Sequence, residues 1–280
     1  MQTLARLLTI DRRWIFLFIG LAVLVPFLTG LKFLQGTPTP ATLAVFNYID
    51  QLPPGSVVAI GFDYGPAGMP EMHPMAMAII RQCFQRHLRV VALTIHPQGP
   101  LMAEAAFNRV RGDYKAKYGQ DYVNLGFKPG GQAVILGIGS GIRNVYPTDM
   151  RGTPLSALPV MRGVRTYDDI AILIDLATGN APGAWIAFGH QRFKVKMAIG
   201  ITAVMATDFY VYYQTGQLVG ILNGMRGAAE YENLVKHPDV GVLGMSSQSV
   251  AHLVIIVFVL LGNIGYFASR AHRRKQGGMA

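Results

Sequence analysis

Cysteine and charged residues are both scarce in this chain. It has one cysteine, Cys83, among 280 residues, and 14% of the residues are charged. A single thiol excludes a fold held by disulfides within the chain and a zinc module built from cysteines. Disordered chains combine low hydrophobicity with high charge, whereas 51% of this sequence is apolar. We therefore expect a folded chain.

Two long apolar runs lie near the ends of the chain. Residues 14–34 contain one charged residue, Lys32, and are long enough to cross a hydrocarbon core of about 30 Å. A cleaved signal peptide is the alternative for this run, but its apolar core would be shorter and would precede an Ala-x-Ala site. Residues 250–268 contain no charged residue. Both runs are predicted to be transmembrane helices.

Basic residues flank both runs on the sides that face the chain ends. Residues 1–13 include three arginines, and residues 269–280 include three arginines and one lysine. Because basic residues gather on the cytoplasmic side of membrane spans, both tails are predicted to be cytoplasmic. Residues 36–248 are then expected to form an extracytoplasmic domain, held at two points in the cytoplasmic (inner) membrane.

The net charge of +10 would by itself suggest a nucleic-acid partner. The two tails and Lys32 carry +7 of it, which leaves +3 for the domain. The basic residues of the domain also form no run with interleaved aromatic residues. We therefore expect the tails to contact anionic lipid headgroups, and we expect no nucleic-acid partner.

The domain alternates short apolar runs with helical patterns. Consecutive apolar residues are typical of strands buried on both faces, and their alternation with helices predicts a doubly wound, mainly parallel α/β sheet with a Rossmann-like rhythm. Five strands are expected, at residues 57–62, 89–95, 132–138, 169–176 and 195–204. Helices are expected at residues 71–87, 101–118 and 216–236. An alternative for residues 197–225, in which Asp208 is the one charged residue, is that part of them is embedded in the membrane.

Polar residues gather in the segments that follow the expected strands. Open parallel sheets bind ligands beyond the carboxyl ends of their strands, and a mixed polar set suits a small polar ligand. The predicted ligand-binding residues are Asp63, Tyr64, His96, Ser140, Asp149, Asp175, Asp208, Tyr210 and Gln214. The competing interpretation is that they form the turns and caps that join strands to helices.

Signals of catalysis are weak. Residues 137–141 read Gly-Ile-Gly-Ser-Gly, without the Gly-Lys-Ser/Thr of a phosphate loop, and Ser140 lacks the Gly-x-Ser-x-Gly frame of a hydrolase nucleophile. His73 and His96 have no partner nearby in the sequence, and no His-Glu-x-x-His motif occurs. We expect no cofactor and no metal, and a non-enzymatic role is favoured.

Gly216, Gly220 and Gly224 recur at helical spacing in the segment expected to form the last helix. Each glycine inside a helix costs about 1 kcal/mol relative to alanine, so three on one stripe indicate close packing. The packing partner is either the domain's own sheet or a second copy of the chain.

The first functional hypothesis is that the chain, anchored at two points, is a scaffold subunit of a homo-oligomeric membrane complex. Other membrane proteins are its expected further partners. The alternatives are a membrane-anchored receptor domain for a small ligand and a membrane-bound hydrolase.

Overall fold

The computed structural model describes residues 11–32 and 36–277. It divides into two compact units: residues 35–242 form one, and residues 1–34 with residues 243–280 form the other. The first ten residues and the side chains of residues 271–280, on which the topology prediction depends, lie outside the described part. The first unit contains the whole sheet and is called the domain below.

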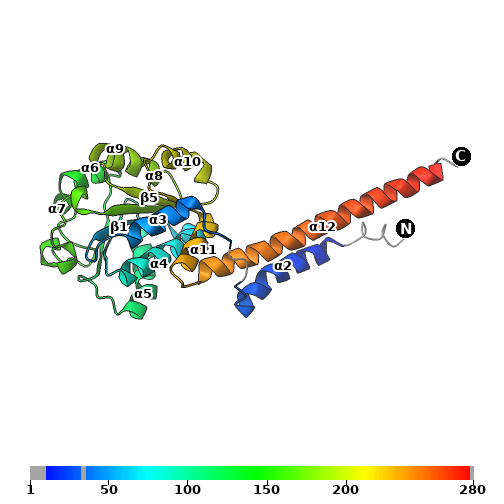
Figure 1. Cartoon of the computed structure of the whole chain (residues 1–280), viewed down its shortest axis with the longest axis horizontal. Helices are drawn as coiled ribbons and strands as arrows, with labels where there is room; N and C mark the ends of the chain where they lie inside the picture. Colours follow the sequence, from blue (N-terminus) through cyan, green and yellow to red (C-terminus); the bar gives the residue numbers. More distant parts are fainter. Residues whose placement is uncertain (1–10, 33–35, 278–280) are drawn as a thin grey trace. The chain divides into compact units, whose positions relative to one another are not determined.

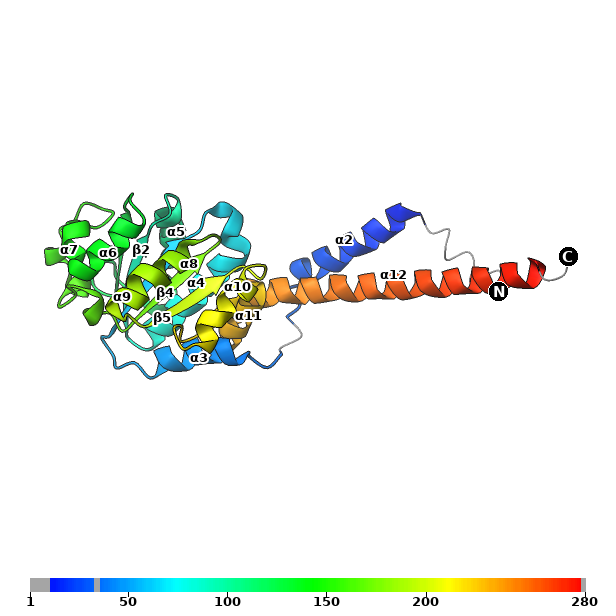
Figure 2. The same ribbon diagram turned by 90° about the horizontal axis from the view of Figure 1, so that it is seen from above.

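Two helices are long and apolar enough to cross a membrane. α2 (Arg12–Thr29) begins where the Asp11 carboxylate accepts a hydrogen bond from the backbone N–H of Arg13 (2.9 Å). α12 (Val240–Gly277) is one continuous helix (Figure 2), and its apolar part extends to Ala268. In the most apolar 18 residues of each helix, only 11% of the residues are buried, whereas the core helix of a soluble domain is mostly buried. Length, composition and exposure together indicate a membrane protein.

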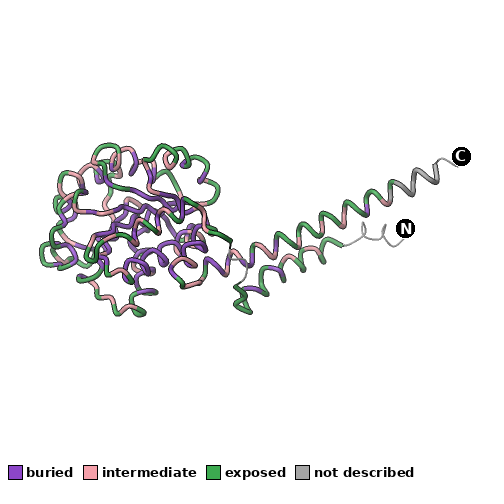
Figure 3. Tube along the Cα trace, viewed as in Figure 1, coloured by how far each residue is buried: buried purple, intermediate pink, exposed green. Residues whose placement is uncertain are grey.

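Six parallel strands form the sheet of the domain, in the order β3-β2-β1-β4-β5-β6. The strands are β1 (Val57–Asp63), β2 (Arg89–Thr94), β3 (Tyr122–Phe127), β4 (Ile172–Ala177), β5 (Met197–Ile201) and β6 (Ile221–Asn223). The trace in Figure 3 shows that buried residues concentrate in these strands. All residues of β1, β4 and β5 are buried, which is why their sequences are apolar without alternation.

Helices cover both faces of the sheet (Figure 1). One face packs against α3 (Pro40–Asp50), α4 (Met69–Gln85), α5 (Gly99–Tyr114) and α11 (Gly224–Leu234). The other packs against α6 (Gln132–Ser140), α7 (Ile142–Val145), the π-helix η6 (Trp185–His190) and α10 (Ala206–Gln214). The short helices are η2 (Pro66–Gly68), η3 (Leu155–Ala157), η4 (Pro159–Met161), η5 (Tyr167–Asp169), α8 (Ala181–Ala184) and α9 (Gln191–Phe193).

The predicted third strand is wrong. Residues 132–138 belong to helix α6, in which Val134, Ile135 and Ile138 are buried while Ala133 is exposed. A short apolar run has no periodicity that separates a strand from a buried helix. The strand in this part of the chain is β3, and β6 is an additional strand, so the sheet has six strands instead of the expected five.

The glycine stripe predicted in residues 216–236 does not form, because β6 and α11 occupy this segment. Gly216 adopts φ 74° in the turn after α10, and Gly224 adopts φ 54° at the start of α11. Gly220 lets the α3 backbone approach, since a Cβ there would lie 2.2 Å from the carbonyl oxygen of Ala41. A spacing of four residues makes a stripe only in a continuous helix, and the three residues of β6 interrupt it.

The first turn of α12 is fixed by a buried carboxylate of α11. Glu232 is 2% exposed and accepts hydrogen bonds from the backbone N–H groups of Asp239, Gly241 and Val242 at 2.8–2.9 Å. These N–H groups would otherwise have no partner within the helix. Arg81, also buried, pairs with Asp239 (3.4 Å). The end of the domain is therefore held firmly where the second apolar helix begins.

Candidate functional site

The order of the strands reverses between β1 and β4, because the chain adds β2 and β3 on one side of β1 and β4, β5 and β6 on the other. In open parallel sheets, loops on either side of such a reversal diverge and leave room for a ligand at the carboxyl edge. The loops after β1, β2 and β4 are therefore the first place to examine. Of the predicted residues, Tyr64 and His96 lie in these loops, Asp63 ends β1, and Asp175 lies within β4.

Asp63 is the last residue of β1 and is 3% exposed. One carboxylate oxygen accepts hydrogen bonds from the Thr94 hydroxyl (2.8 Å) and the Ile95 backbone N–H (2.7 Å). The other accepts a hydrogen bond from the indole N–H of Trp185 (2.8 Å). These three donors satisfy the charge of Asp63 and join the ends of β1 and β2 to the π-helix η6.

Asp175 lies in the middle of β4, where its backbone pairs in register with Gly61 of β1. It is fully buried, and neither carboxyl oxygen has a hydrogen-bond partner. A Cβ at Gly61 would lie 2.6 Å from one of these oxygens, so glycine is required beside the carboxyl group. Burial raises the pKa of Asp175 well above its ordinary value, and the nearby Asp63 raises it further. Burial and the neighbouring carboxylate therefore both favour the neutral form of Asp175.

Tyr146 adds a second unpartnered polar group to the same face of the sheet. Its side chain is fully buried, and its hydroxyl makes no hydrogen bond. Burial, and then the charge of Asp63, raise the pKa of Tyr146 above its ordinary value. Two kinds of polar group thus lie beneath the carboxyl edge. The carboxylate of Asp63 is hydrogen-bonded, whereas the side chains of Asp175 and Tyr146 have no hydrogen-bond partner.

Above these groups, the loop after β1 lies between the loops after β2 and β4. A Cβ at Gly65 would lie 2.2 Å from the side-chain oxygen of Gln98, and a Cβ at Gly68 would lie 2.3 Å from the methyl carbon of Thr178. Gln98 is exposed, and His96 and Thr178 are half-buried. The three loops therefore touch one another, and together they are called the polar rim below.

Tyr64, which follows β1, and His73, which is in α4, form a hydrogen-bonded pair next to the rim. The buried Tyr64 hydroxyl lies 3.1 Å from Nδ1 of His73. Burial raises the pKa of Tyr64 and lowers the pKa of His73, so both groups are neutral near pH 7. Glu71, on the first turn of α4, accepts a hydrogen bond from the Ala203 backbone N–H (3.1 Å) and ties this loop to the one after β5.

Helices α4 and α5 both begin at the rim, and no side chain caps either N-terminus. By contrast, Thr39 caps α3. In α5 the N–H groups of Gly99 and Met102 donate to the carbonyls of His96 and Gln98, and in α4 the first turn already contains the carboxylate of Glu71. What these helix ends offer an anion is therefore mainly the positive end of the helix dipole. The rim therefore combines hydrogen-bonding side chains with two helix ends that favour negative charge.

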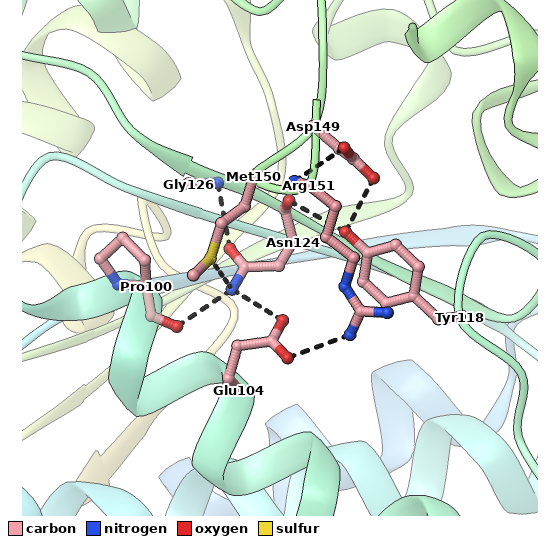
Figure 4. Close-up of polar contacts among 8 residues, drawn as sticks. All are labelled: Pro100, Glu104, Tyr118, Asn124, Gly126, Asp149, Met150 and Arg151. Atoms are coloured by element: carbon pink, nitrogen blue, oxygen red, sulfur yellow. Dashed lines mark hydrogen bonds and ion pairs between the residues drawn. The ribbon is translucent and has the colours of Figure 1, made fainter. Parts of the chain in front are cut away.

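Asp149 lies apart from the rim, in the segment that covers the edge strand β3 (Figure 4). Its carboxylate accepts hydrogen bonds from the Tyr118 hydroxyl (2.8 Å) and from the backbone N–H groups of Arg151 and Thr153. The Arg151 guanidinium lies over the ring of Tyr118, 3.5 Å from its centroid, and pairs with Glu104 (3.2 Å). All of these contacts are internal, which favours the turn-forming interpretation of Asp149.

Asn124 of β3 completes this edge cluster. Its side-chain amide donates hydrogen bonds to the Pro100 carbonyl (3.0 Å) and the Glu104 carboxylate (3.2 Å), and its backbone carbonyl accepts one from the Met150 backbone N–H (2.9 Å). The unpaired side of an edge strand is a template for aggregation. The segment around Met150 covers it.

The remaining predicted residues are dispersed. Ser140 ends α6 instead of following a strand, which removes the geometric basis of the hydrolase hypothesis. Asp208, Tyr210 and Gln214 are exposed on α10, and no hydrogen bond in the described ranges links them to the rim. Within residues 11–32 and 36–277, no three His, Cys, Asp or Glu side chains gather as metal ligands.

Gln98 and Thr178 lie in the segments that follow the second and fourth expected strands, but they are not among the predicted ligand-binding residues. Trp185 and Tyr146 are not predicted at all. Trp185 is 122 positions from Asp63, and no local pattern shows that its indole N–H reaches that carboxylate. Comparisons of the chain with protein-family models, curated proteins and solved structures found no match.

Proposed function

We propose that this protein is a membrane-anchored receptor domain that binds a small anionic ligand at the rim formed by the loops after β1, β2 and β4. The observation that carries the proposal is the meeting of these loops at the strand-order reversal, beside the uncapped N-termini of α4 and α5. The order of the strands is that of Rossmann-like folds, which bind anionic groups at this place. Gln98, His96 and Thr178 would supply hydrogen bonds to the ligand.

The scaffold and hydrolase hypotheses remain predictions without an observation to favour them. The scaffold hypothesis rests on the two apolar spans, the compact domain, the absence of a catalytic motif and a glycine stripe, and of these the stripe does not form, because the three glycines lie in a turn, before a strand and at a helix start. The hydrolase hypothesis rests on Ser140 or on the region of His73 and His96, and Ser140 ends a helix. A homo-oligomer stays a proposal for the same reason.

A negative charge placed on the rim is expected to weaken anion binding. Gln98→Glu should weaken binding at least tenfold, because the new carboxylate repels the ligand where the helix ends attract it. The measurement is the thermal unfolding of the full chain in detergent with phosphate, succinate, citrate and sugar phosphates, beside neutral sugars. A ligand at about 100 times its Kd stabilises the folded state by about 2.7 kcal/mol.

Gln120→Glu is the matched control, since Gln120 is exposed and precedes β3, at the opposite edge of the sheet. This variant should bind as the unmodified chain does. The proposal is contradicted if no anion in the panel raises the unfolding temperature, or if both variants lose binding equally.

For the topology, we propose that both termini are cytoplasmic and that the domain lies outside the cytoplasmic membrane, as the basic tails favour. The lone Cys83 is fully buried, and burial raises its thiol pKa, so it does not react with maleimides. In intact cells, a membrane-impermeant maleimide should label Gln120→Cys. It should label Gln276→Cys only after permeabilisation, and the reverse pattern would invert the topology.

A further inference from the structure

A hollow of about 340 Å³ lies on the face of the sheet covered by α6, and it shares no residue with the rim. Leu136 and Ser140 of α6 line one side, and Phe188 of η6 with Arg192 and Phe193 of α9 line the other. Its volume is at the lower end of the range for small-molecule sites. We infer that this hollow is a second binding site, for a small carboxylate with an aromatic body.

The walls of the hollow are held by specific packing. Phe193 lies directly on Gly139, where a Cβ would come within 2.3–2.5 Å of three ring atoms. The same ring lies 5.4 Å from the ring of Tyr167, which is buried. Glycine at 139 therefore lets the phenyl ring settle against α6, and the ring is supported from behind.

The opposite wall is formed by the π-helix η6. π-helices are rare in proteins, and those that occur often lie at functional sites. Its first residue, Trp185, is buried and donates its indole N–H to Asp63 (2.8 Å). The position of Phe188, three residues further along η6, is thus tied to the carboxyl group at the end of β1.

The chemistry of the lining selects the ligand. Leu136, Phe188 and Phe193 are half-buried and offer apolar surface, and aromatic rings pack favourably against phenyl rings. Arg192 is exposed and has no ion pair among the described residues, and the exposed Ser140 hydroxyl makes no hydrogen bond there. A guanidinium binds a carboxylate through two parallel N–H donors, and the serine hydroxyl supplies a further donor. An apolar body would pack against Leu136, Phe188 and Phe193, and a carboxylate would accept hydrogen bonds from Arg192 and Ser140.

The test uses 3-phenylpropanoate as the probe and the full chain in detergent, with isothermal titration calorimetry. Arg192→Gln should weaken binding about tenfold or more, because the carboxylate loses its charged partner. Ser140→Glu should abolish binding, since its carboxylate would take the place of the ligand's beside Arg192. Thermal unfolding of each variant checks that it is folded.

Arg143→Gln is the matched control, because Arg143 is exposed on the neighbouring α7 and has no ion pair within the described ranges. It should bind 3-phenylpropanoate as the unmodified chain does. The neutral 3-phenylpropan-1-ol should bind much more weakly than the acid, and acetate should not bind. The inference is overturned if the chain does not bind 3-phenylpropanoate at millimolar concentration, if the alcohol binds equally, or if both arginine variants lose affinity alike.

Discussion

Asp175→Asn is expected to stabilise the protein, and by an amount that grows with pH. The unfolded chain ionises this aspartate near its ordinary pKa of 3.8, whereas the folded state keeps it neutral to a much higher pH. Folding therefore binds a proton, and stability falls by about 1.4 kcal/mol for each pH unit between the two pKa values. Asparagine is uncharged in both states, so it removes this loss.

The measurement is thermal or urea unfolding of both forms in the same detergent between about pH 4 and pH 9. The difference in the free energy of unfolding should be small near pH 4, just above the unfolded-state pKa, and should widen as the pH rises. Asp50→Asn is the control, because Asp50 is half-exposed and only loosely paired with Arg86 (3.7 Å). A variant that is less stable than the unmodified chain at pH 8 would show that Asp175 is ionised in the fold.

Asp63→Ala should have the opposite sign and the largest cost of any single substitution in the site. It leaves the Ile95 N–H and the Trp185 indole N–H without their acceptor, while the Thr94 hydroxyl keeps the carbonyls of Phe62 and His96 as acceptors. Each buried unsatisfied donor costs about 1–3 kcal/mol, so we expect a loss of about 3–5 kcal/mol in the free energy of unfolding. The expected fall in unfolding temperature is measured by circular dichroism.

Asp50→Ala is again the matched control, and its effect should stay below about 1 kcal/mol because exposed ion pairs contribute little. Two aspartates on the same face of neighbouring strands are thus expected to respond in opposite ways. If Asp63→Ala were as mild as the control, the hydrogen bonds of Asp63 would not hold the ends of β1 and β2 to η6.

The strands that the sequence located correctly share one property. β1, β2, β4 and β5 are runs of consecutive apolar residues, and burial on both faces of a parallel sheet requires that pattern. β3 contains Asn124, whose side chain bonds to Pro100 and Glu104 of α5, and Gly126, which lies against Met150, so its apolar pattern is broken. β6 has three residues, too few for a pattern to show.

The candidate site was predicted in position but not in detail. Asp63 and His96 follow apolar strands, and that alone placed them at the carboxyl edge. Whether a carboxyl group faces solvent or core depends on register, and Asp175 is buried because it lies opposite Gly61 of β1. The same limit applies to Ser140, whose apolar surroundings fit a helix as well as a strand.

The sequence by itself determined the two apolar helices and the parallel α/β character of the domain. These follow from composition and from periodicity along the chain, which are local properties. Tertiary structure alone decided that Asp63 is satisfied by Trp185 while Asp175 has no partner, and that the three glycines have separate roles. These outcomes depend on which residues far apart in the sequence meet across the sheet, and no local pattern records that.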